Sequence, residues 1–306
     1  MALAVRPIED KRLLGIGLVL IAYAMFTVID SCAKWLTQAG MPLTQVVFVR
    51  YAAQLLLVSA IFLPSRGTAL FVTRSPWIEI LRGLSLMAST VTNFIAIQFL
   101  PLTVTSSIMF TMPLMITALS IPMLGETVGW RRWIAIVIGF LGILVIVQPG
   151  TDAFHPAVLW SLAAAFFGAL YALLTRRLAG VDAVTTQQFY AALVATLCFA
   201  PLAASGDWAL PVDGPGWFAF LMIGTAGLVG HQLLTAAHRL APASVLAPFG
   251  YVQIVYMTAS SWLIFSEPPS VRIYVGAPIV IGSGLYIWLR ERQLAKDTVT
   301  NVTAPD

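Results

Sequence analysis

The chain has 306 residues, of which 59% are apolar and only 10% are charged, and its formal net charge is +4. Soluble domains carry about 25% charged residues, so a soluble fold, a disordered chain and a nucleic-acid-binding protein are excluded as the main interpretation. Uncharged stretches recur at the length that a helix needs to cross about 30 Å of hydrocarbon. The sequence therefore predicts an all-α polytopic membrane protein.

Ten transmembrane helices account for the apolar sequence. We expect them over residues 13–36, 43–63, 76–99, 101–124, 131–148, 156–177, 184–204, 214–237, 241–264 and 270–290. The uncharged run 83–125 is about twice as long as one span requires, and Pro101 lies where a new helix can begin. This run predicts a tight hairpin of two spans.

The basic residues predict the orientation of the chain. Fourteen of them fall on the side of the N-terminus: Arg6, Lys11, Arg12, Arg66, Arg74, Arg82, Arg131, Arg132, Arg176, Arg177, Arg239, Arg290, Arg292 and Lys296. The opposite side holds only Arg272, and Lys34 and Arg50 lie within spans. Because cytoplasmic loops are enriched in Lys and Arg, both termini are expected in the cytoplasm of a bacterial cell, with the chain in its inner membrane.

The sequence repeats itself at an offset of 141 residues. Pairs that keep their identity include Pro101 with Pro242, Val104 with Val245, Thr117 with Thr258, Ala118 with Ala259, Ser120 with Ser261, Glu126 with Glu267 and Arg131 with Arg272. Each copy contains five spans, so the second copy enters the membrane from the opposite side. We expect an inverted five-plus-five repeat: an N-terminal segment 1–12, units 13–148 and 156–290, a linker 149–155 and a C-terminal tail 291–306.

Motifs of catalysis and cofactor binding are absent from the sequence. It has no phosphate-binding loop of the form GxxxxGK[ST], and no HExxH, GxSxG or paired cysteine motif. Cys32 and Cys198 lie within apolar segments, where cysteine packs as a small residue. We expect no cofactor and no metal, and partners limited to a small-molecule substrate, the lipid bilayer and a possible second copy of the chain.

Three ionisable residues lie within the first two spans. Asp30 and Lys34 are four residues apart and share a helix face, and Arg50 lies in the second span. One interpretation is a structural ion pair with Arg50 reaching the outer interface; the other is a charge cluster that binds substrate or couples transport to protons. The second is favoured because the residues at the 141-residue offset are uncharged: Tyr171, Thr175 and Ala191.

A second set of candidates would line a central substrate path: Asn93, Phe110, His231, Tyr251 and Gln253. The alternative for the aromatic residues is simple packing between helices. Glu126 and Glu267 occupy matching loops on opposite membrane sides. We expect them to be structural, with Arg131 and Arg272 as local partners.

The order of several short motifs resembles EamA-type carriers of the drug/metabolite transporter superfamily. They are Asp30-x-x-x-Lys34, Arg50, Leu81-Arg82-Gly83, Leu100-Pro101, Pro113, Leu124-Gly125-Glu126, Trp133 and Gly139-x-x-Gly142. The resemblance implies an inverted ten-helix carrier whose spans 5 and 10 stay peripheral. The subgroup that looks most similar includes riboflavin and S-adenosylmethionine carriers, while other relatives export amino acids.

The predicted function is secondary transport of a small polar or aromatic metabolite by alternating access. A passive channel and, more remotely, an integral-membrane enzyme are the alternatives. A channel would more often show rings of charge or a half-helix filter, and the sequence shows neither.

Overall fold

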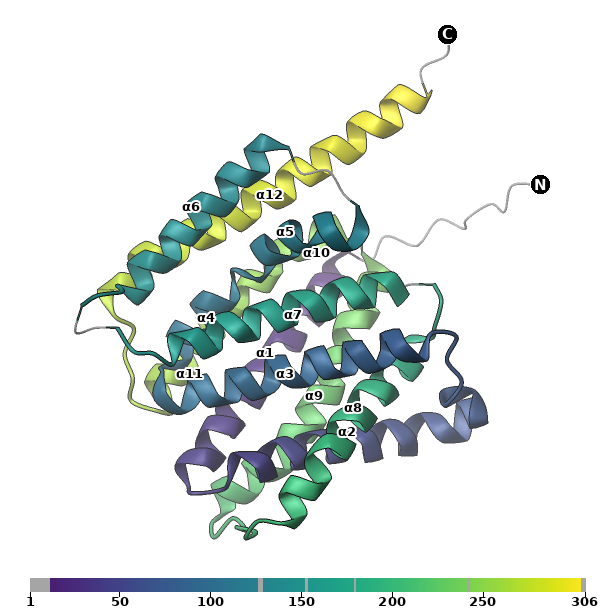
Figure 1. Cartoon of the computed structure of the whole chain (residues 1–306), viewed down its shortest axis with the longest axis vertical. Coiled ribbons are helices and arrows are strands. Elements are labelled where there is room, and N and C mark those ends of the chain that lie inside the picture. Colours follow the sequence, from purple (N-terminus) through teal and green to yellow (C-terminus); the bar gives the residue numbers. More distant parts are fainter. Residues whose placement is uncertain (1–11, 126–128, 152–153, 179, 242, 304–306) are drawn as a thin grey trace.

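The computed structural model describes residues 12–125, 129–151, 154–178, 180–241 and 243–303, and within these ranges it contains helices and turns but no strand. The first half comprises α1 (Arg12–Gln38), α2 (Leu43–Arg66), η1 (Gly67–Leu70), α3 (Pro76–Phe99), α4 (Leu102–Met109), α5 (Met112–Leu124) and α6 (Trp130–Val147). The second comprises α7 (Val158–Leu178), α8 (Val184–Ala204), α9 (Gly214–Leu240), α10 (Ala243–Leu246), η2 (Ala247–Tyr251), α11 (Val252–Leu263) and α12 (Val271–Thr303). Figure 1 shows these helices as one bundle.

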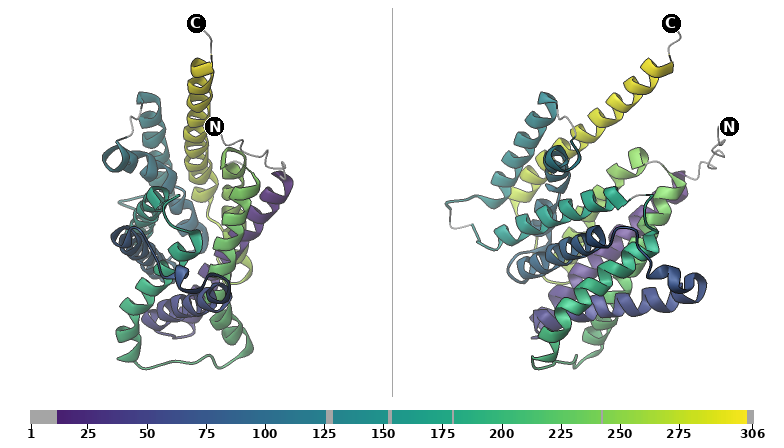
Figure 2. Two further views of the ribbon diagram at one scale, coloured as in Figure 1. Left: turned by 90° about the vertical axis from the view of Figure 1, so that its right-hand side faces the viewer. Right: turned by 45° about the vertical axis from the view of Figure 1, so that its right-hand side comes forward.

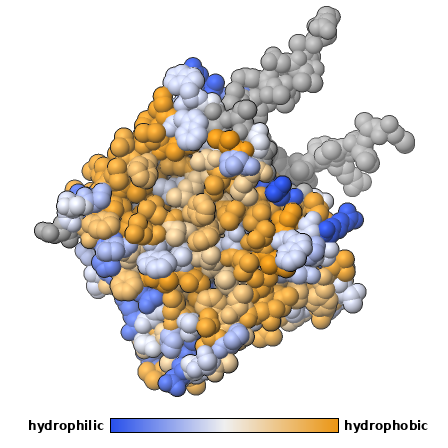
Figure 3. Space-filling model, viewed as in Figure 1, coloured by the Kyte–Doolittle hydropathy of each residue, from blue (hydrophilic) through white to orange (hydrophobic). Residues whose placement is uncertain are grey.

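Each of the ten predicted spans corresponds to helix, which confirms the expected fold class. In the described part of the chain, eight helical segments are long and apolar enough to cross a membrane, and α6 contributes a shorter apolar helix, Trp133–Val147. Large apolar side chains such as Leu56, Phe140 and Trp262 are more than half exposed. Orange surface covers much of the face in Figure 3. Water would oppose such exposure, whereas lipid tails accommodate it.

Helix contacts obey a two-fold relation between the halves. α1 packs along α9 and α3 along α7, while α2 contacts α8, α6 contacts α12, and α4 contacts α11. Each span of the first half corresponds to the span five places later in the second half. When every helix is replaced by its counterpart, the α1·α9 contact becomes α7·α3. The other three pairs do not change, because each joins a helix to its own counterpart. The contacts therefore have the symmetry expected of an inverted repeat.

The fourth and ninth spans are both interrupted. α4 ends at Met109 and α5 begins at Met112, and the ninth span runs through α10 and the 3-10 turn η2 before α11. Proline cannot donate a backbone hydrogen bond and disrupts a helix, which explains the interruptions beside Pro113 and Pro248. The two prolines do not occupy equivalent positions in the repeat. Phe110 and Tyr251 do, and both lie where their span is interrupted.

α6 and α12 pack closely at one side of the bundle (Figures 1 and 2). A Cβ added to Gly142 would lie 2.9 Å from Val280, and one added to Gly276 would lie 2.7 Å from the Gly142 carbonyl oxygen. These glycines serve contacts within one chain. α12 continues through Pro278 to Thr303, whereas the sequence predicted its end at residue 290. The sequence from 279 to 303 contains no proline to stop it.

Candidate functional site

Lys34 joins three separate parts of the chain near one end of the bundle. It lies about 6 Å from the end of α1, and only 1% of its surface is exposed. Its Nζ donates to both carboxylate oxygens of Glu267, at 2.7 and 2.6 Å, and to the Leu100 carbonyl oxygen at 3.1 Å. An ammonium group has three donors, so all the hydrogen bonds of this buried charge are satisfied.

Glu267 is held in place by its own loop. Its backbone N–H donates to the Ser261 carbonyl at 2.9 Å, and the Ser261 hydroxyl donates to Oε2 at 3.2 Å. Ser266 turns the chain with φ 56°, and Gly125, its equivalent in the first half, has φ 68°. The loop therefore keeps the same left-handed turn in both halves although glycine is replaced by serine.

The structure corrects the expected partner of Glu267. Within the described residues, its ion pair is with Lys34 and none joins it to Arg272. The equivalent residue Glu126 lies outside the described residues, so its predicted pairing with Arg131 stays a prediction. The proposal that Glu267 is structural also stays a prediction.

Asp30 and Arg50 occupy a second polar region, deeper in the bundle. Asp30 lies about 12 Å from the end of α1 and accepts a hydrogen bond from Asn93 Nδ2 at 3.0 Å. Arg50 is buried, donates through Nη1 to Thr90, and stacks on the rings of Tyr51 and Phe94, whose centroids lie 4.8 and 5.5 Å from its Cζ.

The expected charge cluster is therefore divided. Across the described chain, no ion pair of 4.0 Å or less joins Asp30 to Lys34 or to Arg50. Asp30 and Arg50 still interact electrostatically, and the Arg50 charge also acts on His231. Lys34 has instead a strong partner at the end of its helix. Asn93 thus stays bonded to Asp30, while Lys34 pairs with Glu267 instead.

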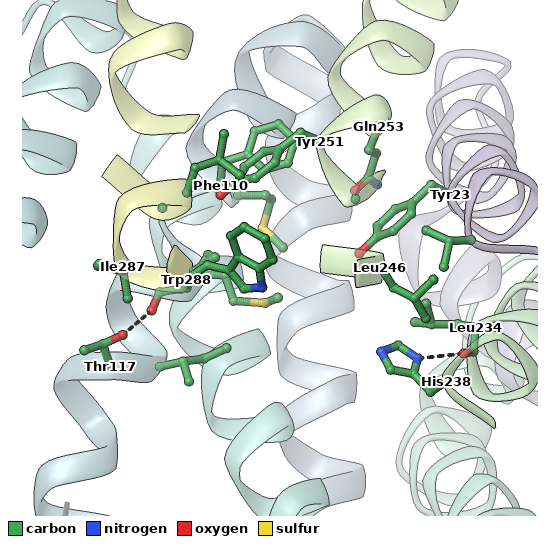
Figure 4. Close-up of a pocket in the computed structure, with 18 residues that line it drawn as sticks. Tyr23, Phe110, Thr117, Leu234, His238, Leu246, Tyr251, Gln253, Ile287 and Trp288 are labelled. Carbon is green, nitrogen blue, oxygen red and sulfur yellow. Dashed lines mark hydrogen bonds between the residues drawn. The ribbon is translucent and has the colours of Figure 1, made fainter. Parts of the chain in front are cut away.

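A cavity of about 420 Å³ lies beyond this region, toward the start of α1. Its volume is within the range of small-molecule sites. The most informative of the lining side chains are Tyr23, Phe110, His238, Tyr251, Gln253 and Trp288. Figure 4 shows them around the cavity, with Phe110 beside Tyr251. Phe110 and Tyr251 have ring centroids 5.1 Å apart, so the two equivalent interrupted spans meet at the cavity.

Three of the five predicted path residues line this cavity. Phe110, Tyr251 and Gln253 do, whereas Asn93 binds Asp30 and the His231 ring packs on Phe26 at 5.1 Å. α12 also lines the cavity, through Gly284, Leu285, Ile287 and Trp288. The implied peripheral place of span 10 is therefore wrong for this part of the helix. Gly284 faces the Tyr251 hydroxyl, with no room for a Cβ between them.

Sequence reasoning missed a buried ion pair in α3. Arg82, which we counted among the residues on the side of the N-terminus, is 1% exposed and donates through Nε to Glu79 at 3.2 Å. It also donates to the Gln187 carbonyl of α8 and stacks on Tyr171 of α7, with 5.1 Å from Cζ to the ring centroid. The i, i+3 spacing of Glu79 and Arg82 within an apolar segment was the available signal.

Comparisons with known proteins agree over nearly the whole chain. The S-adenosylmethionine uptake transporter of Rickettsia felis is 27% identical, with 92% of this chain and 94% of the relative covered. The riboflavin transporter of Vibrio cholerae is 28% identical, with 94% and 99% covered. A solved crystal structure matches with a TM-score of 0.61 and 17% identity over 92% of this chain and 97% of the other, which shows the fold alone.

The family comparison matches the chain twice. Residues 13–148 and 155–289 each match the EamA-like transporter family. The two matches cover the two groups of five spans that the contacts relate by two-fold symmetry. This chain therefore belongs to the EamA-like transporter family and is a membrane transporter of small metabolites, not an enzyme.

Proposed function

We propose that the protein is a secondary transporter that moves a small polar or aromatic metabolite across the bacterial cytoplasmic membrane by alternating access. The observation that supports this most directly is the cavity where Phe110 and Tyr251 meet. Equivalent elements of two inverted units form it together, so exchange of the two units' conformations would move its opening from one membrane side to the other.

The walls of the cavity favour a substrate with a flat ring. Phe110, Tyr251 and Trp288 present aromatic surface, while Tyr23 and Gln253 supply hydroxyl and amide groups. The lining described contains no Asp, Glu, Lys or Arg. We propose that the ring of the substrate binds here and that its charged or zwitterionic group is recognised by Asp30 and Arg50. Riboflavin, S-adenosylmethionine and aromatic amino acids are the first substrates to test.

Uptake into proteoliposomes tests the proposal. Riboflavin or S-adenosylmethionine uptake should saturate and should accelerate when unlabelled substrate is loaded inside, because a carrier exchanges its sites across the membrane. Metabolite profiles of deletion and overexpressing cells would identify other substrates. Non-saturable flux without counterflow would indicate a channel, and a chemically altered product would indicate an enzyme.

The orientation has its own test. With both termini in the cytoplasm, the end of the bundle that holds the cavity faces the cytoplasm and the Lys34 end faces outward. Reporter fusions after Gly150 and Gly206 should then report an external location. A cytoplasmic signal from either fusion would contradict this orientation.

A further inference from the structure

A network of hydrogen bonds joins distant parts of the chain at one end of the bundle, which we call the outer end. There Lys34 and Glu267, the outer ion pair, connect the first span, the ninth-to-tenth-span loop and, through Leu100, the junction of the third and fourth spans. Phe265 lies 5.1 Å from Lys34 Nζ, and its ring is 6.4 Å from that of Trp35. The cavity, by contrast, lies toward the other end of α1.

The outer ion pair crosses from one five-span unit to the other. Lys34 and Leu100 belong to the first unit and Glu267 to the second. Alternating access requires helices at one end of the bundle to move apart while those at the other end meet. The outer ion pair joins α1 to the loop after α11, so it must break when these elements separate to open the outer end.

The second unit has no lysine at the position equivalent to Lys34. The counterpart of Lys34 is Thr175, which has no charge and whose hydroxyl donates to the Tyr171 carbonyl of its own helix at 2.7 Å. Thr175 therefore cannot form the equivalent ion pair, and Glu126, the counterpart of Glu267, lies outside the described residues.

We infer that the outer ion pair is the bond that keeps the transport path closed to the outside in the conformation that the structure shows. This inference rests on the proposed function. It assigns Lys34 and Glu267 to conformational control, and it removes Lys34 from substrate binding. Neutralising Glu267 should shift the population toward the conformation that is open to the outside.

A disulfide across the outer end measures that population without any substrate. Ser31 of α1 and Ser260 of α11 have hydroxyl oxygens 2.6 Å apart, so cysteines there would lie near the separation that a disulfide spans. The pair Ser31→Cys and Ser260→Cys, in a chain with Cys32 and Cys198 changed to Ala, should cross-link readily in membranes. Glu267→Gln should slow that cross-linking by about tenfold because the closed state becomes rarer.

Two controls make the result decisive. Asp213→Asn neutralises another carboxylate, at the start of α9 on the same side, and should leave cross-linking unchanged. Where Glu267→Gln alone fails to fold, Lys34→Met with Glu267→Gln leaves no unpaired buried charge and should slow cross-linking equally. Unchanged cross-linking in a folded variant of either kind would overturn the inference. Slowed cross-linking in a protein that transports nothing would count against the proposed function. It would still support the role of the outer ion pair in holding the outer end closed.

Discussion

The two five-span units share a fold but differ in what they bury. Of the charged side chains that the structure describes as buried, all lie in the first unit: Lys34, Arg50, Glu79 and Arg82. At two of the equivalent positions the second unit carries Phe220 and Ile223, and Ile223 is fully buried. Among the described residues, the second unit thus forms the same arrangement of helices without buried charges, although it buries neutral polar residues such as Gln187 and Gln188. The arrangement of helices by itself therefore does not require the charges of the first unit.

The largest effect on stability is expected at the Glu79–Arg82 pair, because the second unit has apolar residues at the equivalent positions. Arg82→Met would leave Glu79, which is fully buried, without its partner, so the protein should lose about 3–5 kcal/mol of stability. Adding Glu79→Leu should recover most of that loss, since the second unit packs apolar residues there. Thermal unfolding in detergent measures both. A double variant as unstable as the single one would show that this pair serves more than charge compensation.

The next effect concerns transport and not stability. Asp30→Asn keeps a hydrogen-bonding group for Asn93, and Arg50→Gln keeps one for Thr90, but each removes a charge. We expect uptake to fall by about a hundredfold, or ~2.7 kcal/mol, at normal abundance in the membrane. Asp207→Asn, in an exposed loop, is the matched control. Full uptake by either variant would show that the charges are dispensable for transport.

A smaller effect is expected where the units contribute equally. Gly142→Ala and Gly276→Ala place a methyl group against α12 and α6 respectively, so each should destabilise the protein by about 1–3 kcal/mol. Gly282→Ala is the control, because a Cβ there would meet nothing within 4 Å. The apparent KM should not change in the molecules that fold. A changed KM would mean that the α6·α12 contact also shapes the site.

The smallest effect should be shared by the equivalent aromatic residues of the cavity. Phe110→Leu and Tyr251→Leu each remove a ring from the ring pair, and each should raise KM by about fivefold, or ~1 kcal/mol. Trp262→Leu, on the lipid-facing surface, is the control. A large effect from one variant and none from the other would break the symmetric description of the binding site. Normal KM in both would remove these rings from the substrate path.

The sequence by itself determined the number of spans, the repeat and the odd number of helices in each unit. These properties depend on the transfer of contiguous residues from water to lipid, and on residues recurring at one offset, so they can be read along the chain. Proline disrupts a helix, so the interruptions beside Pro113 and Pro248 have a cause in the sequence, although α12 continues through Pro278. Phe110 and Tyr251 were predicted to line one substrate path, but the contact between their rings depends on how the fourth and ninth spans pack.

The tertiary structure alone decided which charges meet. From helical spacing, Asp30 was a suitable partner for Lys34, yet Lys34 pairs with Glu267, 233 residues away. Arg82 was counted with the residues on the side of the N-terminus and is instead buried beside Glu79, against α8 and α7. A buried charge takes the partner that satisfies most of its hydrogen bonds at the least desolvation cost, and that partner is set by how distant helices pack, which local sequence does not encode.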